Sequence, residues 1–230
     1  MPRRDPRVLV YTRTTAYRHD SIPDGVRTLR ELGAGHGFLV DATERPEDFE
    51  GARLRPYDAV VFLSTSGEVL GEAGRAALEA HHADGAGFMG VHAAACTEYD
   101  WPYFGELLGA RFTGHPPLQP GTVLVEDAAH PATAHLDAAW KVTDEWYDFD
   151  RSPRPGVRVL ASADESSYTG GSMGGDHPLV WCHTYGGGPV FYTALGHCAQ
   201  AYRDAAFRAH LLGGLRSVLP GVADRTGPAD

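Results

Sequence analysis

The chain has 230 residues, of which 43% are hydrophobic and 22% are charged, a composition typical of a globular protein. Its formal net charge is −10, from 20 basic and 30 acidic side chains. Nucleic acids and anionic membranes are therefore poor partners, because an acidic surface repels phosphate groups. No apolar run reaches the roughly 20 residues that span a bilayer, and the N-terminus shows no export signal, so we expect a cytoplasmic protein.

Strand and helix patterns alternate through the first half of the chain. Residues 7–11 (RVLVY) predict an opening strand, and a polar loop then leads to a helix that starts near Ser21 and Pro23. Further strands are expected at residues 38–40, 59–63 and 87–91, and further helices at residues 72–83 and 101–108. This alternation predicts an α/β fold with a doubly wound, mostly parallel sheet.

The second half of the chain is richer in strand patterns. We expect extended segments at residues 122–126, 157–162, 179–184 and 190–194, and a closing amphipathic helix at residues 204–219. The glycine-rich residues 185–189 predict a hairpin turn between the last two strands, which adds antiparallel pairing to the sheet. No linker or repeat divides the chain, so we expect one domain over residues 1–230, with a core at about residues 7–219 and a disordered tail at residues 220–230.

Histidines occur where strands are expected to end. His19 lies in the loop after the first strand, His92 directly follows the fourth, and His197 follows the last. His177 precedes the first strand of the hairpin, and His115 can reach the same edge from a long loop. Ligands of open parallel sheets bind outside the carboxyl ends of the strands, so these positions favour a functional site. Structural roles stay open for each residue, for example as loop anchors at His115 and His177, which both precede proline.

Two groups of acidic and aromatic residues are further candidates. Asp144 and Glu145 stand beside Trp146 and Tyr147, and an acid held against aromatic surface can serve as a proton donor or acceptor. A solvated acidic turn anchored by its aromatic residues is the alternative. Residues 98–101 (EYDW) also combine acids with aromatic rings, as a sugar-binding face does.

Several familiar catalytic motifs are absent from the sequence. It contains no phosphate-binding GxxxxGK[ST] loop, no GxSxG and no HExxH. The three cysteines form no CxxC pair, which argues against a disulfide framework. They are also weak candidates for a nucleophile, because Cys182 lies inside a predicted strand, Cys198 follows His197, and Cys96 lies four residues beyond the turn at His92.

Six short motifs follow one another along the chain: YRHDSI at residues 17–22, GVHAA at 90–94, GARFTGHP at 109–116, DEWY at 144–147, the segment 177–181, and the segment 188–197. Together they resemble the ThuA-like, or trehalose-utilisation protein, family. The resemblance implies a class I glutamine amidotransferase-like fold, with a flavodoxin-like sheet and added strands. Amidotransferases of that fold carry a nucleophilic cysteine where this chain has His92, so glutaminase activity is not expected.

The resemblance implies a role in carbohydrate metabolism, with trehalose or a keto-sugar as the substrate. We expect an enzyme that catalyses hydrolysis, elimination or isomerisation, in which His92 or Glu145 moves the proton. The expected substrate-binding residues are Trp101, Asp144, Trp146, Tyr147 and His177.

The family resemblance also implies a divalent metal bound through histidines. Zinc held by two or three of His19, His115 and His197 would polarise a sugar carbonyl or activate water. Two alternatives stay open: a non-catalytic carbohydrate-binding or sensor module, and a metal-free enzyme in which His92 and Glu145 form an acid–base pair. The expected partner is a small-molecule carbohydrate, and a homo-oligomer is compatible with the sequence.

Overall fold

The computed structural model describes residues 4–219, so the tail expected at residues 220–230 lies outside the described residues. Five strands run parallel: β1 (Arg7–Tyr11), β2 (Leu39–Thr43), β3 (Ala59–Leu63), β4 (Gly87–Val91) and β11 (Gly188–Thr193). Four antiparallel strands continue the sheet: β10 (Pro178–Tyr185), β9 (Arg158–Asp164), β6 (Gln119–Val125) and β7 (Ala139–Asp144). The order across this nine-stranded sheet is β2-β1-β3-β4-β11-β10-β9-β6-β7. A separate small sheet pairs β5 (Phe112–Gly114) with β8 (Asp148–Phe149).

The parallel strands form the buried centre of the protein. Every residue of β3 and β4 is buried, as expected for strands that are covered on both faces. Phe62 of β3, Phe88 of β4 and the nearby Phe104 pack together with ring centroids 5.3 to 5.7 Å apart. This continuous apolar centre holds the carboxyl ends of the strands in fixed positions.

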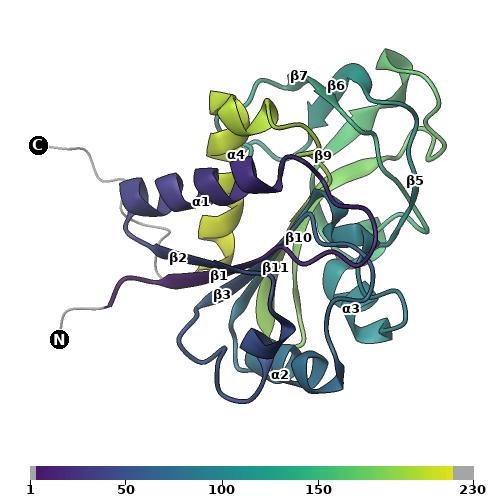
Figure 1. Ribbon diagram of the computed structural model, residues 1–230. Coiled ribbons are helices and arrows are strands. Elements are labelled where there is room, and N and C mark those ends of the chain that lie inside the picture. The colour runs from purple at the N-terminus through teal and green to yellow at the C-terminus, as the bar shows by residue number, and fades with distance from the viewer. Residues whose placement is uncertain (1–3, 220–230) are drawn as a thin grey trace, which may run out of the picture.

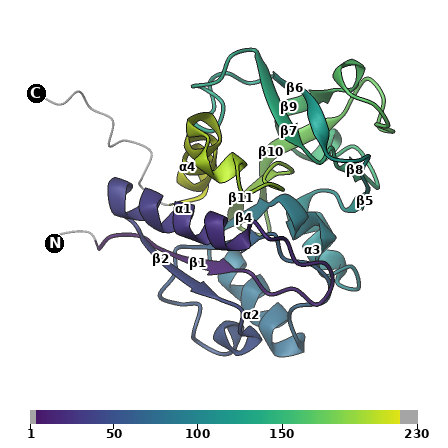
Figure 2. The same ribbon diagram turned by 45° about the horizontal axis from the view of Figure 1, so that its top comes forward.

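Within residues 4–219, four α-helices accompany the sheet: α1 (Ile22–His36), α2 (Glu72–Ala83), α3 (Pro102–Leu108) and α4 (Ala205–Val218). Helices α1 and α4 lie side by side on one side of the sheet, and α2 and α3 lie on the other (Figures 1 and 2). Close contact explains a glycine in α1, since a Cβ atom on Gly25 would come within 2.8 Å of the Leu63 side chain. No helix within residues 4–219 is both long and apolar enough to cross a bilayer.

The structure confirms the hairpin predicted between β10 and β11. The part of the chain after α3 also contains strands that the sequence pattern did not predict. Gly186 and Gly187 both have positive φ, which glycine adopts at low cost, and they turn the chain between β10 and β11. Strands β5, β7 and β8 were not predicted, because they are short or alternate between exposed and half-buried residues. The architecture is an α/β fold with a large, mostly parallel sheet and added antiparallel strands, consistent with a flavodoxin-like fold; its doubly wound arrangement stays a prediction.

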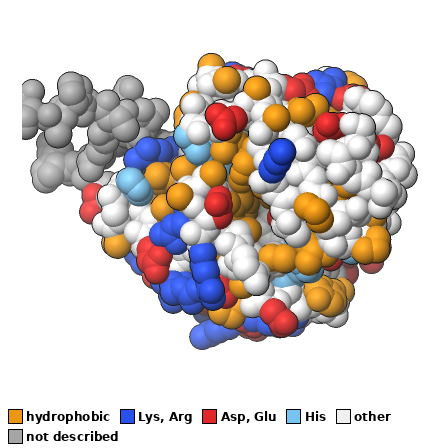
Figure 3. Space-filling model, turned by 90° about the horizontal axis from the view of Figure 1, so that it is seen from above, with side chains coloured by type: hydrophobic (Ala, Val, Ile, Leu, Met, Phe, Trp, Pro, Cys, Tyr) orange, Lys and Arg blue, Asp and Glu red, His pale blue; other side chains and the backbone are white. Residues whose placement is uncertain are grey.

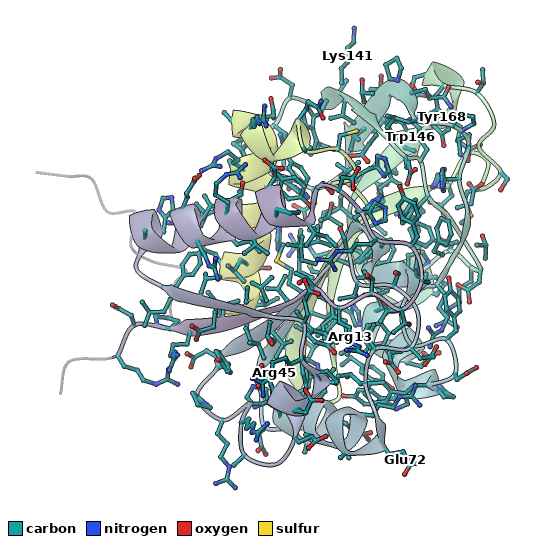
Figure 4. The ribbon with its side chains drawn as sticks, viewed as in Figure 1. Arg13, Arg45, Glu72, Lys141, Trp146 and Tyr168 are labelled. Carbon is teal, nitrogen blue, oxygen red and sulfur yellow. The ribbon has the colours of Figure 1, made fainter. Side chains whose placement is uncertain are left out.

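One face of the molecule combines hydrophobic and charged side chains. Figure 3, which views the structure from above, shows hydrophobic side chains near the middle of this face, with acidic and basic side chains around them. Lys141, the only lysine in the sequence, points away from the body of the protein in Figure 4.

Candidate active site

His92 stands at a sharp turn immediately after β4. Its φ is 52°, a backbone conformation that is uncommon for residues other than glycine, and its side chain is fully buried. Nδ1 lies 2.7 Å from the carbonyl oxygen of Ala194 in the loop after β11. Because a carbonyl oxygen only accepts, Nδ1 must donate, and the neutral ring then presents a lone pair at Nε2. The Tyr147 hydroxyl lies 2.9 Å from Nε2 and donates to it.

His19 faces His92 from the loop after β1. The Nε2 atoms of the two rings lie 3.1 Å apart, and the His19 side chain is only 5% exposed. Burial, together with the nearby rings of His92 and His197, lowers the pKa of His19 to about 3. Nδ1 of His19 is buried and has no hydrogen-bond partner among residues 4–219. His19 is therefore a neutral imidazole at physiological pH.

Glu145 follows β7 and lies among three imidazoles. Its Oε2 atom is 3.0 Å from Nδ1 of His197 and 3.5 Å from Nε2 of His92, and its Oε1 atom is 3.5 Å from Nε2 of His115. Burial alone would raise the pKa of Glu145, but the contacts with His197 and His92 outweigh it and hold the pKa well below its usual range. Glu145 in turn raises the pKa of His197, against the opposing effect of burial. The pair is thus a carboxylate beside a readily protonated imidazole.

His19, His115 and Glu145 border a cavity of about 550 Å³, whereas His92 and His197 are not among its lining residues. Aromatic residues supply much of its wall: Tyr17, Tyr99, Phe112 and Tyr147. The Tyr17 and Tyr99 side chains are 67% and 46% exposed, so they present ring surface that is accessible to a ligand. The remaining lining residues are Ala16, His19, Ser66, Gly67, Ala93, Cys96, His115 and Glu145, and none of the twelve is Lys or Arg.

The sequence model of the ThuA family, described as trehalose utilisation, matches residues 7–217. The chain belongs to the ThuA family. The structure is similar to the crystal structure of a ThuA-like protein from Bacteroides uniformis, with a TM-score of 0.78, 27% sequence identity, and coverage of 95% of this chain and 94% of that chain. A ThuA-like protein from Parabacteroides merdae also has a TM-score of 0.78, at 22% identity, with 99% of this chain and 94% of that chain covered.

More distant structures share the fold alone with this ThuA-family chain. The cold-adapted beta-galactosidase from Rahnella sp. R3 matches with a TM-score of 0.58 and 17% identity, over 93% of this chain but only 31% of the galactosidase. A comparison with curated proteins found no match to the chain.

The ThuA-family structure brings most of the predicted catalytic and metal-binding side chains together. His19, His92, His197 and Glu145 could hold a metal ion, because each offers a ligand atom and these atoms all lie within 4.8 Å of one another. His115 contacts the other side of Glu145, and its Nδ1 donates to the carbonyl oxygen of Pro116 at 2.8 Å. The four potential metal ligands therefore include His92 and Glu145. His115, which was predicted as a ligand together with His19 and His197, is not among them.

The donor set of this cluster suits zinc. Three imidazoles and one carboxylate are ordinary zinc ligands, and uncharged imidazoles bind metal ions better than protonated ones. The Nδ1 atom of His197 is a buried polar atom that a cation would satisfy, because it meets Glu145 outside hydrogen-bonding geometry. The residues present thus fit a divalent metal.

Three predicted substrate-binding residues lie outside the cavity lining. Trp146 is fully buried, donates from Nε1 to the carbonyl oxygen of Gln119, and stacks on Tyr168 at 4.6 Å between centroids; the two rings are labelled side by side in Figure 4. Trp101 stacks on Tyr103 instead. Asp144 is 2% exposed, and its carboxylate accepts backbone N–H groups. Only Tyr147 of the predicted aromatic set lines the cavity.

His177, the fourth, is fully buried behind Tyr147. Its Nε2 atom donates to the Tyr147 carbonyl oxygen at 2.8 Å, and its Nδ1 atom lies 2.8 Å from Oε1 of Glu165. With Asp148 these residues form a second cluster of potential metal ligands. Oε1 of Glu165 also accepts the N–H groups of Met173 and Gly174, so this cluster binds the glycine-rich loop at residues 170–175.

Two aromatic residues of the cavity wall, Tyr17 and Phe112, were not predicted as site residues from the sequence. Tyr17 and Phe112 belong to the family motifs, but nothing in their local pattern indicates that their rings face a ligand. Tyr99 belongs to the predicted sugar-binding group at residues 98–101, whereas its neighbour Glu98 turns inward and pairs with Arg75. Tyr17 lies in the loop after the first parallel strand. An aromatic residue at such a position is the sequence signal that could have identified it.

Cys96 lines the cavity but is a poor nucleophile. Burial raises the pKa of its thiol to about 12, against a small opposing effect of the Tyr147 hydroxyl. The reactive form of cysteine is the thiolate, so this side chain stays unreactive at neutral pH. The chemistry of the site therefore depends on its imidazoles, the Glu145 carboxylate and the Tyr147 hydroxyl.

Proposed function

We propose that this ThuA-family chain is an enzyme that transforms a small-molecule carbohydrate, trehalose or a keto-sugar, by hydrolysis, elimination or isomerisation. The observation that carries the proposal is the ionised Glu145 carboxylate, set among His92, His115 and His197 beside a cavity walled by aromatic rings. The match to the trehalose-utilisation family supports a sugar as the substrate. The net charge of −10 supports a partner that is neither nucleic acid nor membrane.

The site contains the groups that acid–base catalysis needs. Glu145 raises the pKa of His197, which favours His197 as the group that donates a proton to a sugar oxygen. The Nε2 lone pair of His92 accepts the Tyr147 hydroxyl and can take up its proton, because the Nδ1 atom of His92 is committed to Ala194. Burial raises the pKa of Tyr147 well above its ordinary value, so its hydroxyl stays a hydrogen-bond donor at neutral pH. Such groups typically accelerate proton transfers by about 10²- to 10⁴-fold.

A divalent metal, which we propose to be zinc, would be held by His19, His92, Glu145 and His197. When bound, zinc supplies Lewis acidity toward a sugar carbonyl or a water molecule. Metal ligation would occupy the lone pairs of His92 and Glu145, so proton transfer would then fall to His115 and Tyr147, which also line the cavity. The metal-free alternative keeps His92 and Glu145 as the acid–base pair.

The cavity wall favours a sugar without phosphate or carboxylate groups. Tyrosine and phenylalanine rings pack against the C–H faces of sugars, while hydroxyl and imidazole groups form hydrogen bonds with their oxygens. No Lys or Arg among the lining residues offers a partner for an anion, and Glu145 would repel one.

The test is turnover of trehalose, other disaccharides and their keto derivatives, followed by NMR, with and without added ZnCl₂. We expect turnover of at least one sugar, and a loss of about 10²-fold or more in Glu145→Gln. Glu106→Gln is the matched control, because Glu106 is an exposed carboxylate paired with Arg151. Equal turnover by Glu145→Gln and the wild type would contradict the proposed chemistry.

A carbohydrate-binding module is the second candidate, favoured by the exposed rings of Tyr17 and Tyr99. It predicts saturable sugar binding by calorimetry and no turnover under any of these conditions. Zinc would then leave the affinity for the sugar unchanged.

A further inference from the structure

Asp144 ends β7 with a buried carboxylate that contacts backbone on two sides. Its Oδ1 atom accepts the N–H of Glu145 at 2.9 Å and the N–H of His197 at 3.1 Å. Its Oδ2 atom accepts the N–H of Gly196 at 2.8 Å. The side chain is 2% exposed, so these bonds are made away from solvent.

The two segments that Asp144 joins are far apart in the sheet. β7 is an edge strand, and β10, β9 and β6 lie between it and β11. The loop after β11 turns sharply at Gly196, where φ is 120° and a Cβ atom would lie 2.9 Å from the Tyr202 hydroxyl. The N–H groups in such a turn cannot join a strand ladder and need another acceptor. The Asp144 carboxylate is that acceptor.

We propose that Asp144 is a positioning residue that fixes the loop after β11 against the segment after β7, and so sets the 3.0 Å contact between His197 and Glu145. Its bonds reach the backbone of both members of this pair. Asp144 is not among the residues that line the cavity, and its oxygens are already engaged. The substrate-binding role predicted for it from the sequence is therefore less well supported than positioning. The catalytic consequence, although not the positioning itself, rests on the proposed function.

Amide hydrogen exchange tests this directly in the wild-type protein. The N–H groups of Gly196 and His197 lie outside the strands, yet they should be protected because the carboxylate holds them. In Asp144→Asn, one of the two acceptor oxygens becomes an NH₂ donor, so we expect at least one of the two amides to exchange about tenfold faster or more, the effect of losing one buried hydrogen bond. Amides within β11 should keep their protection.

The matched control is Asp204→Asn. Asp204 also accepts a backbone N–H, from Phe207 at the start of α4, but it is not bonded to the loop at residues 196–197. Its substitution should leave the exchange of Gly196 and His197 unchanged. Rapid exchange of these two amides in the wild-type protein would overturn the inference even if Asp144→Asn does not fold.

A second readout separates positioning from a general loss of stability. At one fixed pH, the ring ¹⁵N resonances of His197 should shift in Asp144→Asn, whereas those of His210, which is buried against Ala132 and Thr193, should not. Equal shifts in both histidines, or no shift in His197, would contradict positioning.

Failure of this inference can be distinguished from failure of the proposed function. Glu145→Gln should leave the Gly196 and His197 amides protected, because their acceptor is Asp144. If exchange behaves as expected but no sugar is turned over, the positioning role stands and the proposed function fails. If turnover depends on Glu145 while Asp144→Asn keeps the amides protected, the positioning role fails and the function stands.

Discussion

The Nε2 atoms of His19 and His92 lie 3.1 Å apart, although 73 residues separate the two histidines along the chain. His197 completes the group, with its ring 5.1 Å from that of His19 and 5.4 Å from that of His92, measured between centroids. Three imidazoles that meet in this way cannot all be protonated, because like charges repel and burial penalises each charge. At least one ring is therefore neutral, and a neutral ring can offer a nitrogen lone pair to a metal ion at this cluster, which Glu145 also joins.

Zinc affinity should depend on the histidines of this group and not on His115. We expect His19→Ala and His197→Ala to lower the affinity by more than the roughly 10- to 100-fold typical of losing an outer-shell partner. His115→Ala serves as the control, because its Nδ1 atom is committed to Pro116 and its ring lies outside the group of four. Calorimetric titration of each variant with ZnCl₂ measures the effect. An equal loss in His115→Ala and His19→Ala would contradict the assignment.

The titration of His197 should depend on Glu145. Glu145 raises the pKa of His197, so the folded protein keeps this proton at pH values where the unfolded chain, with an ordinary pKa of 6.5, has released it. The contribution of the pair to stability is therefore complete below pH 6.5 and is lost as the pH rises through the raised pKa. In Glu145→Gln we expect the His197 pKa to fall, measured from its ring proton shift by NMR. The control variant Glu106→Gln should leave the pKa of His197 at its wild-type value.

The segment DEWY at residues 144–147 shows what the sequence could and could not predict. Its acids and aromatic residues indicated a functional site, and Glu145 and Tyr147 do lie there. Consecutive side chains of an extended chain point to opposite sides, so Asp144 and Trp146 face other parts of the protein. Which side faces the cavity depends on Gly196 and Tyr168, which are distant in sequence and leave no mark on the local pattern.

The gathering of histidines at one edge of the sheet was predictable for a different reason. Parallel strands carry their carboxyl ends to one edge, so His19, His92 and His197 could be placed together from the strand pattern alone. His177 precedes β10 as expected, but its side chain turns behind Tyr147 because Glu165 and the Tyr147 carbonyl oxygen hold both of its nitrogens. A side chain's orientation follows from its partners, which strand prediction does not supply.

The exposed tyrosines should govern sugar binding. We expect Tyr99→Ala and Tyr17→Ala to raise KM by about 3- to 10-fold, with a smaller effect on kcat, because a stacked ring contributes roughly 0.5–1.5 kcal/mol. Tyr99→Phe separates the ring from the hydroxyl, which donates to the Phe112 carbonyl oxygen. Steady-state kinetics on a responsive sugar provide the measurement, or calorimetry if the protein only binds. Unchanged KM in both alanine variants would remove these rings from the binding site.

Replacing Trp146 should affect the stability of the protein and not the binding of sugar. Trp146→Phe should leave KM unchanged, since the ring lies outside the cavity lining. It should lower the free energy of unfolding by about 1–3 kcal/mol, because the Gln119 carbonyl oxygen loses its buried donor. Urea unfolding and steady-state kinetics on the same preparation decide the matter. A raised KM with unchanged stability would instead support the sugar-stacking role expected from the sequence.

Acidification should destabilise the protein in part through His210. This side chain is fully buried, with Nδ1 donating to the Ala132 carbonyl oxygen and Nε2 accepting from the Thr193 hydroxyl, and burial lowers its pKa to about 4. The unfolded chain takes up this proton near pH 6.5, so unfolding binds a proton between pH 6.5 and about pH 4. Stability should therefore fall with decreasing pH in this window, by at most about 1.4 kcal/mol per pH unit from this one group.

Replacing His210 should reduce this pH dependence. His210→Gln is expected to be less stable at neutral pH, yet its free energy of unfolding should fall less between about pH 7 and about pH 5 than that of the wild type. His135→Gln is the comparison, because His135 is exposed and is only a secondary cause of the lowered His210 pKa, so its loss should change the slope less than the loss of His210 does. Urea unfolding at each pH gives the slope directly. If His210→Gln and the wild type lose stability in parallel, then the folded protein protonates His210 as readily as the unfolded chain does, and its buried hydrogen bonds do not hold the ring neutral.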